Sequence, residues 1–361
     1  MLVEPLELSG PTFTPERAVT EIARDCLGCG SKRLVRVRRY RSESAAGRRL
    51  FADASLLRCG ICGVVQVEPV PTSSALEDYY AEAYRTGGRH GAGVADVKHF
   101  PRDNMYFMYR GQSIASLIAE HLPARASVPL RILDVGAGFG HLLHALGERF
   151  PGSSRSAIEI SQVCVDHLRT LGVTVHQALT ESVLAGLTEE YDIIALSHVL
   201  EHLRDPAGVL ALLRDRLAAN GVLYVEVPHI PPDSLTRYID HAWAPRHDEP
   251  HITFFSPSSL RKLLEGAGLA VWMLDAAGPE YADVNWAAFH IPPPKTVLLR
   301  LVPDAIKRVL RQRGIGRGIS VFDHEGPFYR YGGRGIWLRS LSSVSPARDG
   351  DDGFTGSPQV P

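Results

Sequence analysis

The pattern of apolar and polar residues from residue 131 onward predicts a parallel α/β sheet. Short apolar runs, each long enough for a buried strand, alternate with amphipathic stretches of helical periodicity. Strands are predicted at 131–136, 154–160, 173–178, 191–199, 222–228 and 269–276, with a closing strand at 334–342. Helices are predicted at 141–150, 161–172, 206–221 and 256–269, where serine, proline or glycine marks most of the helix ends.

The residues before 127 follow a different pattern. Two strands, at 34–40 and 55–60, flank a flexible connection at 42–50, and a pair of cysteines lies at each end of this unit. An acidic, aromatic helix at 73–85 and an amphipathic helix at 112–121 then lead into the α/β domain. The pattern predicts a small N-terminal module, a helical connection and a larger α/β domain.

Four of the five cysteines form two pairs with two residues between partners, Cys26 with Cys29 and Cys59 with Cys62. Each such turn presents two thiolates, and two turns complete a tetrahedral Zn²⁺ shell. A redox role is the alternative, but two pairs in one short module favour a structural zinc ion. Since four protein ligands leave no open position, this metal would hold the module together without taking part in chemistry.

Composition and charge narrow the possible classes of protein. Of the 361 residues, 45% are hydrophobic and 22% charged, as in ordinary globular proteins, and the net charge of −1 argues against a global polyanion-binding role. The first residues lack the basic start and apolar stretch of a signal peptide, and no apolar run reaches the length of about 18 residues that a membrane span needs. We therefore expect a cytoplasmic protein without a transmembrane span.

Basic residues concentrate between the two cysteine pairs. A ribbon of this charge can bind nucleic acid or a phosphorylated small substrate, or it can be a solvated face. The solvated face is favoured over nucleic acid because Tyr40 is the only aromatic residue among these basic positions. The basic residues are Lys32, Arg33, Arg36, Arg38, Arg39, Arg41, Arg48 and Arg49.

A glycine-rich turn, DVGAGFG at 134–140, follows the first predicted strand of the α/β domain and opens a helix. This is the context of a cofactor-binding loop, whose backbone and helix N-terminus approach the ligand. A dinucleotide-binding turn would have its third glycine at position 141, which is His141. Asp134 instead suits a ligand with an amino group, and Glu159, at the end of the second strand, suits ribose hydroxyls. The alternative is an ordinary strand–turn–helix glycine cluster.

These residues resemble the class I S-adenosylmethionine-dependent methyltransferases. The motifs DVGAGFG, AIEIS, YDIIALSHVLEHL and GVLYVEVP occur in the order typical of that family, over roughly Arg131–Ala276. The resemblance implies a cofactor site in which Asp134 and the Gly136–Gly140 loop hold the methionine part. The resemblance also implies that Glu159 binds the ribose and that Ile160, Ala178 and Leu179 lie beside the adenine. Ser197 and His198 would face the sulfonium side. The loop comprises Gly136, Ala137, Gly138, Phe139 and Gly140.

The N-terminal module is similar to the zinc-bearing leader of a bacterial subgroup that includes sugar C-methyltransferases. Those enzymes carry a Tyr-His-Glu-His run before an aromatic–Phe–Ser stretch, and only His251 and the final Phe-Ser are present here. We also expect no counterpart of the large additional C-terminal domain of that subgroup. The resemblance therefore supports methyl transfer but leaves sugar C-methylation unsupported.

Six histidines after the fourth and fifth strands, at the edge where such sheets bind ligands, are candidates for a general base. We rank His251 first, as base or as substrate-orienting residue, then His198, and we include His202. Glu201 and His202 could equally form a capping pair. The remaining candidates are His229, His241 and His247.

The expected fold is an α/β, Rossmann-like methyltransferase sheet of six to seven strands, with helices on both faces and a small N-terminal zinc ribbon. The expected units are a disordered tail at 1–20, the zinc ribbon at 21–72, a helical linker or lid at 73–126, the methyltransferase domain at 127–345 with a helical insertion around 277–333, and a disordered tail at 346–361.

The expected function is S-adenosylmethionine-dependent methyl transfer to a small-molecule or glycan acceptor, assisted by a histidine base. The alternatives are a ribosomal-RNA methyltransferase that uses the basic ribbon, and a non-catalytic zinc-ribbon protein with an inert methyltransferase fold. The segment 296–313 combines leucines and valines with basic residues. It could contact a membrane surface, although a helix docked on the domain or at a dimer contact is favoured. The acceptor atom and the oligomeric state stay open.

Overall fold

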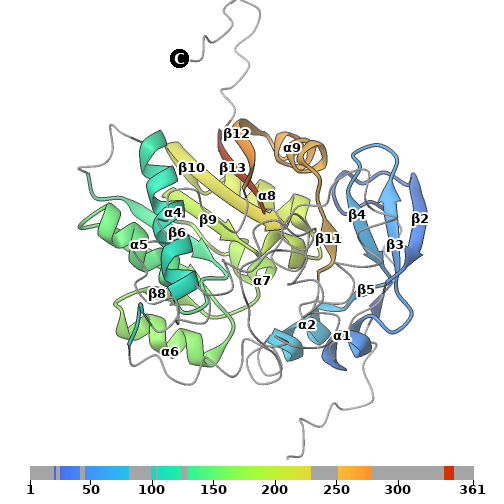
Figure 1. Cartoon of the computed structure of the whole chain (residues 1–361), viewed down its shortest axis with the longest axis horizontal. Coiled ribbons are helices and arrows are strands. Elements are labelled where there is room, and N and C mark those ends of the chain that lie inside the picture. Colours follow the sequence, from blue (N-terminus) through green and yellow to red (C-terminus); the bar gives the residue numbers. More distant parts are fainter. Residues whose placement is uncertain are drawn as a thin grey trace, which may run out of the picture.

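A mixed seven-stranded sheet forms the centre of the larger part of the molecule (Figure 1). The computed structural model describes residues 20–21, 25–40, 45–80, 99–102, 105–122, 128–228, 251–277 and 337–344. The order of strands is β12-β13-β10-β9-β6-β7-β8, in which β13 runs antiparallel to both of its neighbours. The strands are β6 (Arg131–Val135), β7 (Ser154–Ile158), β8 (Thr174–His176), β9 (Tyr191–Ser197), β10 (Leu217–Pro228), β12 (Leu269–Ala277) and β13 (Trp337–Val344). The predicted Rossmann-like sheet with helices on both faces is confirmed.

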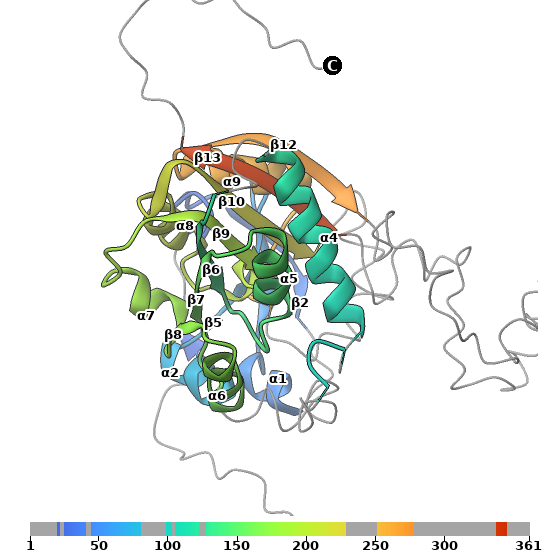
Figure 2. The ribbon, with the colours of Figure 1, turned by 90° about the vertical axis from the view of Figure 1, so that its left-hand side faces the viewer.

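The alternation of side chains along each strand builds one hydrophobic layer on each face of the sheet. In β10, Leu223, Val225 and Val227 face one layer, whereas Val222 and Tyr224 face the other. Figure 2 shows α4 and α5 on one side of the strands and α7 and α8 on the other. The first layer is covered by α7 (Thr180–Leu184), α8 (Pro206–Arg214) and α9 (Pro257–Gly266), and the second by α4 (Met105–His121), α5 (His141–Arg149) and α6 (Gln162–Thr170).

The N-terminal module is a ribbon of four antiparallel strands, and one of them comes from a distant part of the chain. β11 (Thr253–Phe254) pairs with β4, so that Thr253 lies opposite Gln66 and Phe254 opposite Val65. Figure 1 places β11 at the border between the two sheets. The order is β11-β4-β3-β2, with β2 (Leu34–Arg39), β3 (Ser55–Cys59) and β4 (Val65–Glu68). A separate pair joins β1 (Thr20–Glu21) to β5 (Val70–Pro71), and α2 (Ser73–Asp78) follows.

The connection at 42–50, predicted to be flexible, contains the helix α1 (Ala45–Leu50). The prediction was wrong because the helix and the turn after it supply apolar side chains to the ribbon core. Leu50 and Phe51 are buried, and the ring of Phe51 lies 4.7 Å from that of Tyr40, measured between centroids.

The helix predicted at 206–221 ends at Arg214, and Leu217 already begins β10 by pairing with Tyr191. Gly221 is therefore not a helix cap. Its backbone passes so close to other backbone that an added Cβ would lie 2.8 Å from the carbonyl oxygen of Ala218. Asn220, just before it, has a positive φ of 62°. Gly221 therefore allows β10 to make a tight backbone irregularity, where the register of pairing with β9 shifts.

Several sequence predictions fall outside the described residues. These are the tails at 1–20 and 346–361, the insertion at 277–333 and the basic segment 296–313, apart from Thr20 in β1 and Ala277 in β12. No helix in the described part of the chain has the length and the apolar run needed to cross a bilayer.

The contact between α4 and α5 gives a first testable prediction. A Cβ at Gly111 of α4 would lie 2.8 Å from the carbonyl oxygen of His141, a backbone atom that cannot move without shifting α5. Gly111→Ala should therefore lower the free energy of unfolding by about 1–3 kcal/mol, as overpacking does. Chemical denaturation measures the change.

The matched control is Gly266→Ala, at the end of α9, where an added Cβ meets nothing within 4 Å. This substitution should leave the free energy of unfolding unchanged or raise it by up to about 1 kcal/mol. Equal destabilisation by both substitutions would contradict the close approach of α4 and α5.

Candidate functional site

The glycine turn between β6 and α5 has a backbone that other residues cannot easily adopt. Gly136, Gly138 and Gly140 all have positive φ, at 70°, 55° and 82°. The turn is also tightly packed, because a Cβ at Gly136 would lie 2.5 Å from Val199 and one at Gly140 would lie 2.6 Å from Leu168. Both the backbone conformation and the close packing therefore require glycine.

Glu159 follows β7 and is fixed by the turn beside it. Its carboxylate accepts hydrogen bonds from the backbone N–H groups of Gly138, Ile160 and Ser161, at 2.8, 2.9 and 2.8 Å. Three backbone donors orient the carboxylate, and within the described ranges no side-chain cation is paired with it. The side chain is nearly buried but reaches the wall of a pocket.

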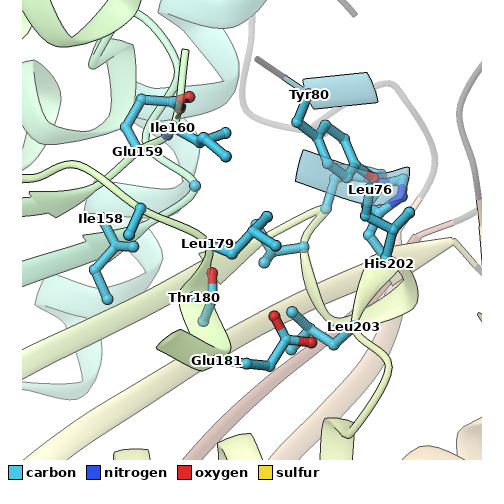
Figure 3. A pocket seen from close by; sticks show the side chains of 14 residues that line it. Leu76, Tyr80, Ile158, Glu159, Ile160, Leu179, Thr180, Glu181, His202 and Leu203 are labelled. Atoms are coloured by element: carbon cyan, nitrogen blue, oxygen red, sulfur yellow. Dashed lines mark hydrogen bonds between the residues drawn. The ribbon is translucent and has the colours of Figure 1, made fainter. Parts of the chain in front are cut away.

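This pocket lies at the carboxyl ends of β6, β7 and β9, and its two walls come from different parts of the chain. Figure 3 shows Glu159 and Ile160 on one side, and Tyr80, Leu76 and His202 across the pocket from them. Tyr80 and Leu76 come from α2 and the turn after it, so the N-terminal module supplies part of the wall. The predicted cofactor residues among the lining are Gly136, Glu159, Ile160, Ala178, Leu179 and His198.

The other predicted cofactor residues do not line the pocket. The N–H of Gly138 binds Glu159, the N–H of Ala137 points to the carbonyl of Ile158 at 3.4 Å, and the ring of Phe139 lies 5.7 Å from that of His167. Gly140 begins α5 as its capping residue. Asp134 and Ser197 are not part of its lining and lie on the face of the sheet that α4 covers.

Three polar residues on adjacent strands face α4 and meet a single cation there. Asp134, Ser197 and Glu226 occupy the positions of β6, β9 and β10 that alternate with the apolar residues of the opposite layer. Arg110 of α4 contacts the hydroxyl of Ser197 and the carboxylate of Glu226, with its Nε 2.8 Å from Glu226 Oε1. The Glu226 side chain is fully buried, and Tyr224 donates a second hydrogen bond to it at 2.5 Å.

Burial alone would raise the pKa of Glu226. The charges of Arg110 and His198 and the hydrogen bonds from His198 and Tyr224 outweigh burial, so this pKa lies well below its usual range. Asp134 is also buried but receives less support. Burial raises the pKa of Asp134 to about 8, although Arg110 opposes the shift and Glu159 adds to it. At neutral pH, Glu226 is therefore ionised and Asp134 is largely protonated.

His198 follows β9 directly, has a positive φ of 58° and lies between two carboxylates. Its Nδ1 is 3.1 Å from Glu201 Oε1 and its Nε2 is 3.3 Å from Glu226 Oε1. Burial and the charge of Arg110 lower the pKa of His198, but the two carboxylates outweigh them and the pKa is raised. Both ring nitrogens are engaged by protein groups.

The other two histidines predicted to act in catalysis lie side by side. His202 lines the pocket, whereas His251, only 5% exposed, does not; their ring centroids are 4.7 Å apart. The backbone N–H of Ile252 donates to the carbonyl of Glu201 at 2.8 Å, which places His251 beside Glu201. His202 is therefore the nearer of the two to a ligand. The further candidates, His229, His241 and His247, lie outside the described residues.

A family described as "Methyltransferase domain" matches residues 106–274. This range holds the glycine turn, Glu159, the pocket histidines and the Arg110–Glu226 pair. Residues 106–274 thus match a methyltransferase domain. The match does not include the cysteine ribbon before it.

Two relatives of the methyltransferase domain are named ubiquinone biosynthesis O-methyltransferase. The ubiquinone biosynthesis O-methyltransferase of Cereibacter sphaeroides (strain ATCC 17029 / ATH 2.4.9) is 28% identical over 167 residues, which cover 44% of this chain and 66% of that protein. The enzyme of the same name from Dinoroseobacter shibae is 30% identical over 149 residues, which cover 39% of this chain and 60% of that protein. The chain thus spans somewhat less than two thirds of the length of these relatives.

Solved structures with a similar fold are more distant. Coclaurine N-methyltransferase bound to N-methylheliamine and SAH is 16% identical, with a TM-score of 0.41, and covers 64% of this chain and 72% of its own. The plantazolicin methyltransferase BpumL, in complex with a triazolic desmethylPZN analog and SAH, is 13% identical, with a TM-score of 0.43, and covers 75% of this chain and 96% of its own.

The four paired cysteines converge in the ribbon that precedes the methyltransferase domain. The sulfur atoms of Cys26 and Cys62 are 3.5 Å apart, those of Cys29 and Cys59 are 3.7 Å apart, and all four lie within 4.8 Å of one another. Four sulfurs at 2.3 Å from a tetrahedral zinc ion would be separated by about 3.8 Å. Two backbone N–H groups also point at these sulfurs, from Gly28 to Cys26 at 3.4 Å and from Ile61 to Cys59 at 3.3 Å. The donor set and its spacing fit a zinc ion.

The sequence patterns missed several residues of the methyltransferase site. Glu226 was visible as a lone acid inside an apolar strand, a position that requires a buried partner. Arg110 gave no signal, because its partner is 116 residues away. Tyr80 and Leu76 lie in a helix that the sequence predicted, but nothing local showed that it borders the pocket.

The buried carboxyl of Asp134 gives a pH-dependent prediction. Between its ordinary pKa of 3.8 and about 8, the native state keeps a proton that the unfolded chain has lost. The contribution of Asp134 to stability therefore falls as pH rises through this window. Asp134→Asn removes the ionisation but keeps the shape of the side chain.

Denaturation curves measured from about pH 5 to about pH 9 should show wild-type protein losing stability relative to Asp134→Asn up to about pH 8, and no further loss above that value. Parallel stability curves for the two proteins would show that Asp134 ionises normally in the native state.

Proposed function

We propose that this chain transfers the methyl group of S-adenosylmethionine to a hydroxyl oxygen of a small-molecule or glycan acceptor. The observation that carries the proposal is the carboxylate of Glu159, held by three backbone N–H groups at the wall of a pocket that also contains histidine. The names of the curated relatives, which are O-methyltransferases of ubiquinone biosynthesis, favour oxygen as the acceptor atom.

The residues around the pocket fit the cofactor in three places. Glu159 would accept hydrogen bonds from the ribose hydroxyls, because its backbone donors orient it and leave acceptor capacity toward the pocket. Ile160, Ala178 and Leu179 would contact the adenine through the apolar part of the wall. The Gly136–Gly140 turn, with Asp134 beneath it, would face the methionine part, and Ser197 and His198 would lie toward the sulfonium. When bound, the cofactor supplies an electrophilic methyl group.

The reaction is an in-line displacement in which an O–CH₃ bond forms, the S–CH₃ bond breaks with its electron pair left on sulfur, and the hydroxyl proton passes to a base. Positioning supplies much of the rate of such a step. The side of the pocket lined by His198 and His202 is the part suited to the acceptor. His202 reaches the pocket, His251 supports it from behind, and His198 has both ring nitrogens engaged by carboxylates.

This arrangement changes the order of the catalytic candidates. His251 resembles the histidine of the sugar C-methyltransferase run, but it lies behind His202 in the described part of the site. We therefore propose that His202 meets the acceptor hydroxyl and that His251 acts through His202. We do not extend the proposal to sugar C-methylation, since the remaining residues of that run are absent.

We also propose that Cys26, Cys29, Cys59 and Cys62 hold a structural zinc ion. Three of these side chains are buried in a hydrophobic cluster that includes Phe255 and Leu260 of the methyltransferase domain. The ion would thus stabilise both the ribbon and the segment after His251, which joins the ribbon sheet as β11.

The proposed cofactor site is tested by titration calorimetry with S-adenosylhomocysteine. Glu159→Gln should raise the dissociation constant by about tenfold or more, since hydrogen bonds to a charged group are worth about 1.5–3 kcal/mol. Glu148→Gln, an exposed carboxylate on α5, is the control and should bind like wild type. Equal affinity of Glu159→Gln and wild type would overturn the assignment. Binding without transfer to any member of a panel of phenols, catechols and sugars would favour an inert fold.

The zinc proposal predicts one zinc ion per chain that survives dialysis against a weak chelator. Cys59→Ser should lose this ion and disorder the ribbon, because so small a unit has too little core without its metal. Cys164→Ser, a buried cysteine on α6 away from the cluster, should keep it. Elemental analysis and limited proteolysis provide the measurements. Zinc-free wild-type protein with a protease-resistant ribbon would refute the proposal.

A further inference from the structure

We propose that Glu201, His202 and His251 form a second metal site, which holds a divalent transition-metal cation at the acceptor end of the pocket. One carboxylate oxygen and one ring nitrogen from each histidine all lie within 4.8 Å of one another. Only the role that we give the cation, polarising an acceptor hydroxyl, rests on the proposed methyl transfer. The existence of the site does not.

The carboxylate of Glu201 is the observation that points to a missing ligand. The side chain is 1% exposed, and its Oε1 is 3.1 Å from the Nδ1 of His198. Its Oε2 is buried and has no hydrogen-bond partner among the described residues. A buried carboxylate oxygen needs a donor or a cation. His202 and His251 each place a ring nitrogen within 4.8 Å of a carboxylate oxygen of Glu201, close enough to complete a metal shell with it.

Two separate segments of backbone bring the three ligands together. Glu201 and His202 are neighbours in the short 3₁₀ helix η3 (Leu200–His202), directly after β9. His251 is tied to them because the N–H of Ile252 donates to the carbonyl of Glu201 at 2.8 Å. Thr253, the first residue of β11, is in turn paired with Gln66 of the ribbon. The ligands are thus presented by the junction between the ribbon and the methyltransferase domain.

The composition of the cluster indicates which cation would bind. Two imidazoles with one carboxylate form the ligand set of some catalytic zinc sites and of many non-haem iron sites, which leave coordination positions open. Imidazole nitrogen favours Zn²⁺, Fe²⁺ or Co²⁺ over the hard cations Mg²⁺ and Ca²⁺. Ligands at about 2.1 Å from one cation lie at most about 4.2 Å apart, so any pair near the present limit of 4.8 Å would have to move closer on binding.

The open positions of such a cation would face the pocket. His202 is a ligand and also a lining residue, across the pocket from Glu159 (Figure 3). An acceptor hydroxyl, or two neighbouring hydroxyls, would coordinate there through oxygen. A cation acting as a Lewis acid lowers the pKa of a bound hydroxyl, whose proton then leaves to water. With the cation bound, His202 would act on the hydroxyl as a metal ligand, and this role would replace its proposed direct contact with the hydroxyl.

The test uses the full chain with zinc in the cysteine site, titrated with Co²⁺. Wild-type protein should bind one further equivalent, seen as weak visible d–d bands without the intense thiolate-to-metal bands that cobalt in the cysteine site would give. Glu201→Gln and His202→Ala should each weaken this binding by more than about tenfold, because even outer-shell partners contribute about 10–100-fold to metal affinity.

The matched control is His144→Ala, which removes one member of another histidine–carboxylate pair, that with Glu148 on α5. It should bind one equivalent of Co²⁺ like wild type. Circular dichroism shows whether Glu201→Gln is folded, and the pocket residue His202 provides the second variant if it is not. No second equivalent in wild type, or unchanged binding in His202→Ala, would overturn the proposal. Since no acceptor is used, the result is independent of whether methyl transfer occurs.

Discussion

The arrangement of the site depends on the buried ion pair between Arg110 and Glu226. A carboxylate buried against a sheet is tolerated only with a compensating partner. Arg110 of α4, the helix packed on this face of the sheet, provides the compensating positive charge. The same guanidinium contacts Ser197 and opposes the rise that burial causes in the pKa of Asp134, so one cation acts on side chains of three strands. Breaking a buried pair of this kind costs about 3–5 kcal/mol, which fixes α4 to the carboxyl edge of the sheet.

Glu226 also connects this pair to the pocket. Its Oε1 lies 3.3 Å from the Nε2 of His198, whose other ring nitrogen faces Glu201. A continuous row of charged side chains therefore runs from α4, beneath the sulfonium side of the proposed cofactor site, to the cluster of Glu201, His202 and His251. The row orients His198 in a left-handed backbone conformation that a histidine rarely adopts without such support.

The ribbon and the methyltransferase domain are not independent units in this chain. β11 completes the ribbon sheet, Leu76 and Tyr80 border the pocket, and the paired cysteines share a hydrophobic cluster with α9. Lys262 of α9 also donates a hydrogen bond to the carbonyl of Ile61, which lies between Cys59 and Cys62, at 3.1 Å. The position of His251 is therefore decided by pairing within the ribbon as much as by the methyltransferase sheet, which links the cysteine site to the acceptor end of the pocket.

The sequence by itself determined the succession of strands and helices along the predicted α/β domain, the glycine turn and the two cysteine pairs. These are local features, since period-two and helical patterns, turn glycines and two-residue cysteine spacings depend on near neighbours. It could not determine that α1 forms at 45–50 or that the helix at 206 ends at Arg214, because packing against Tyr40 and pairing with Tyr191 decide these. Only the tertiary structure brought Arg110 to Glu226, 116 residues away, and His251 to Glu201. Such contacts form where separate elements meet, and no short-range pattern encodes which side chains will face each other there.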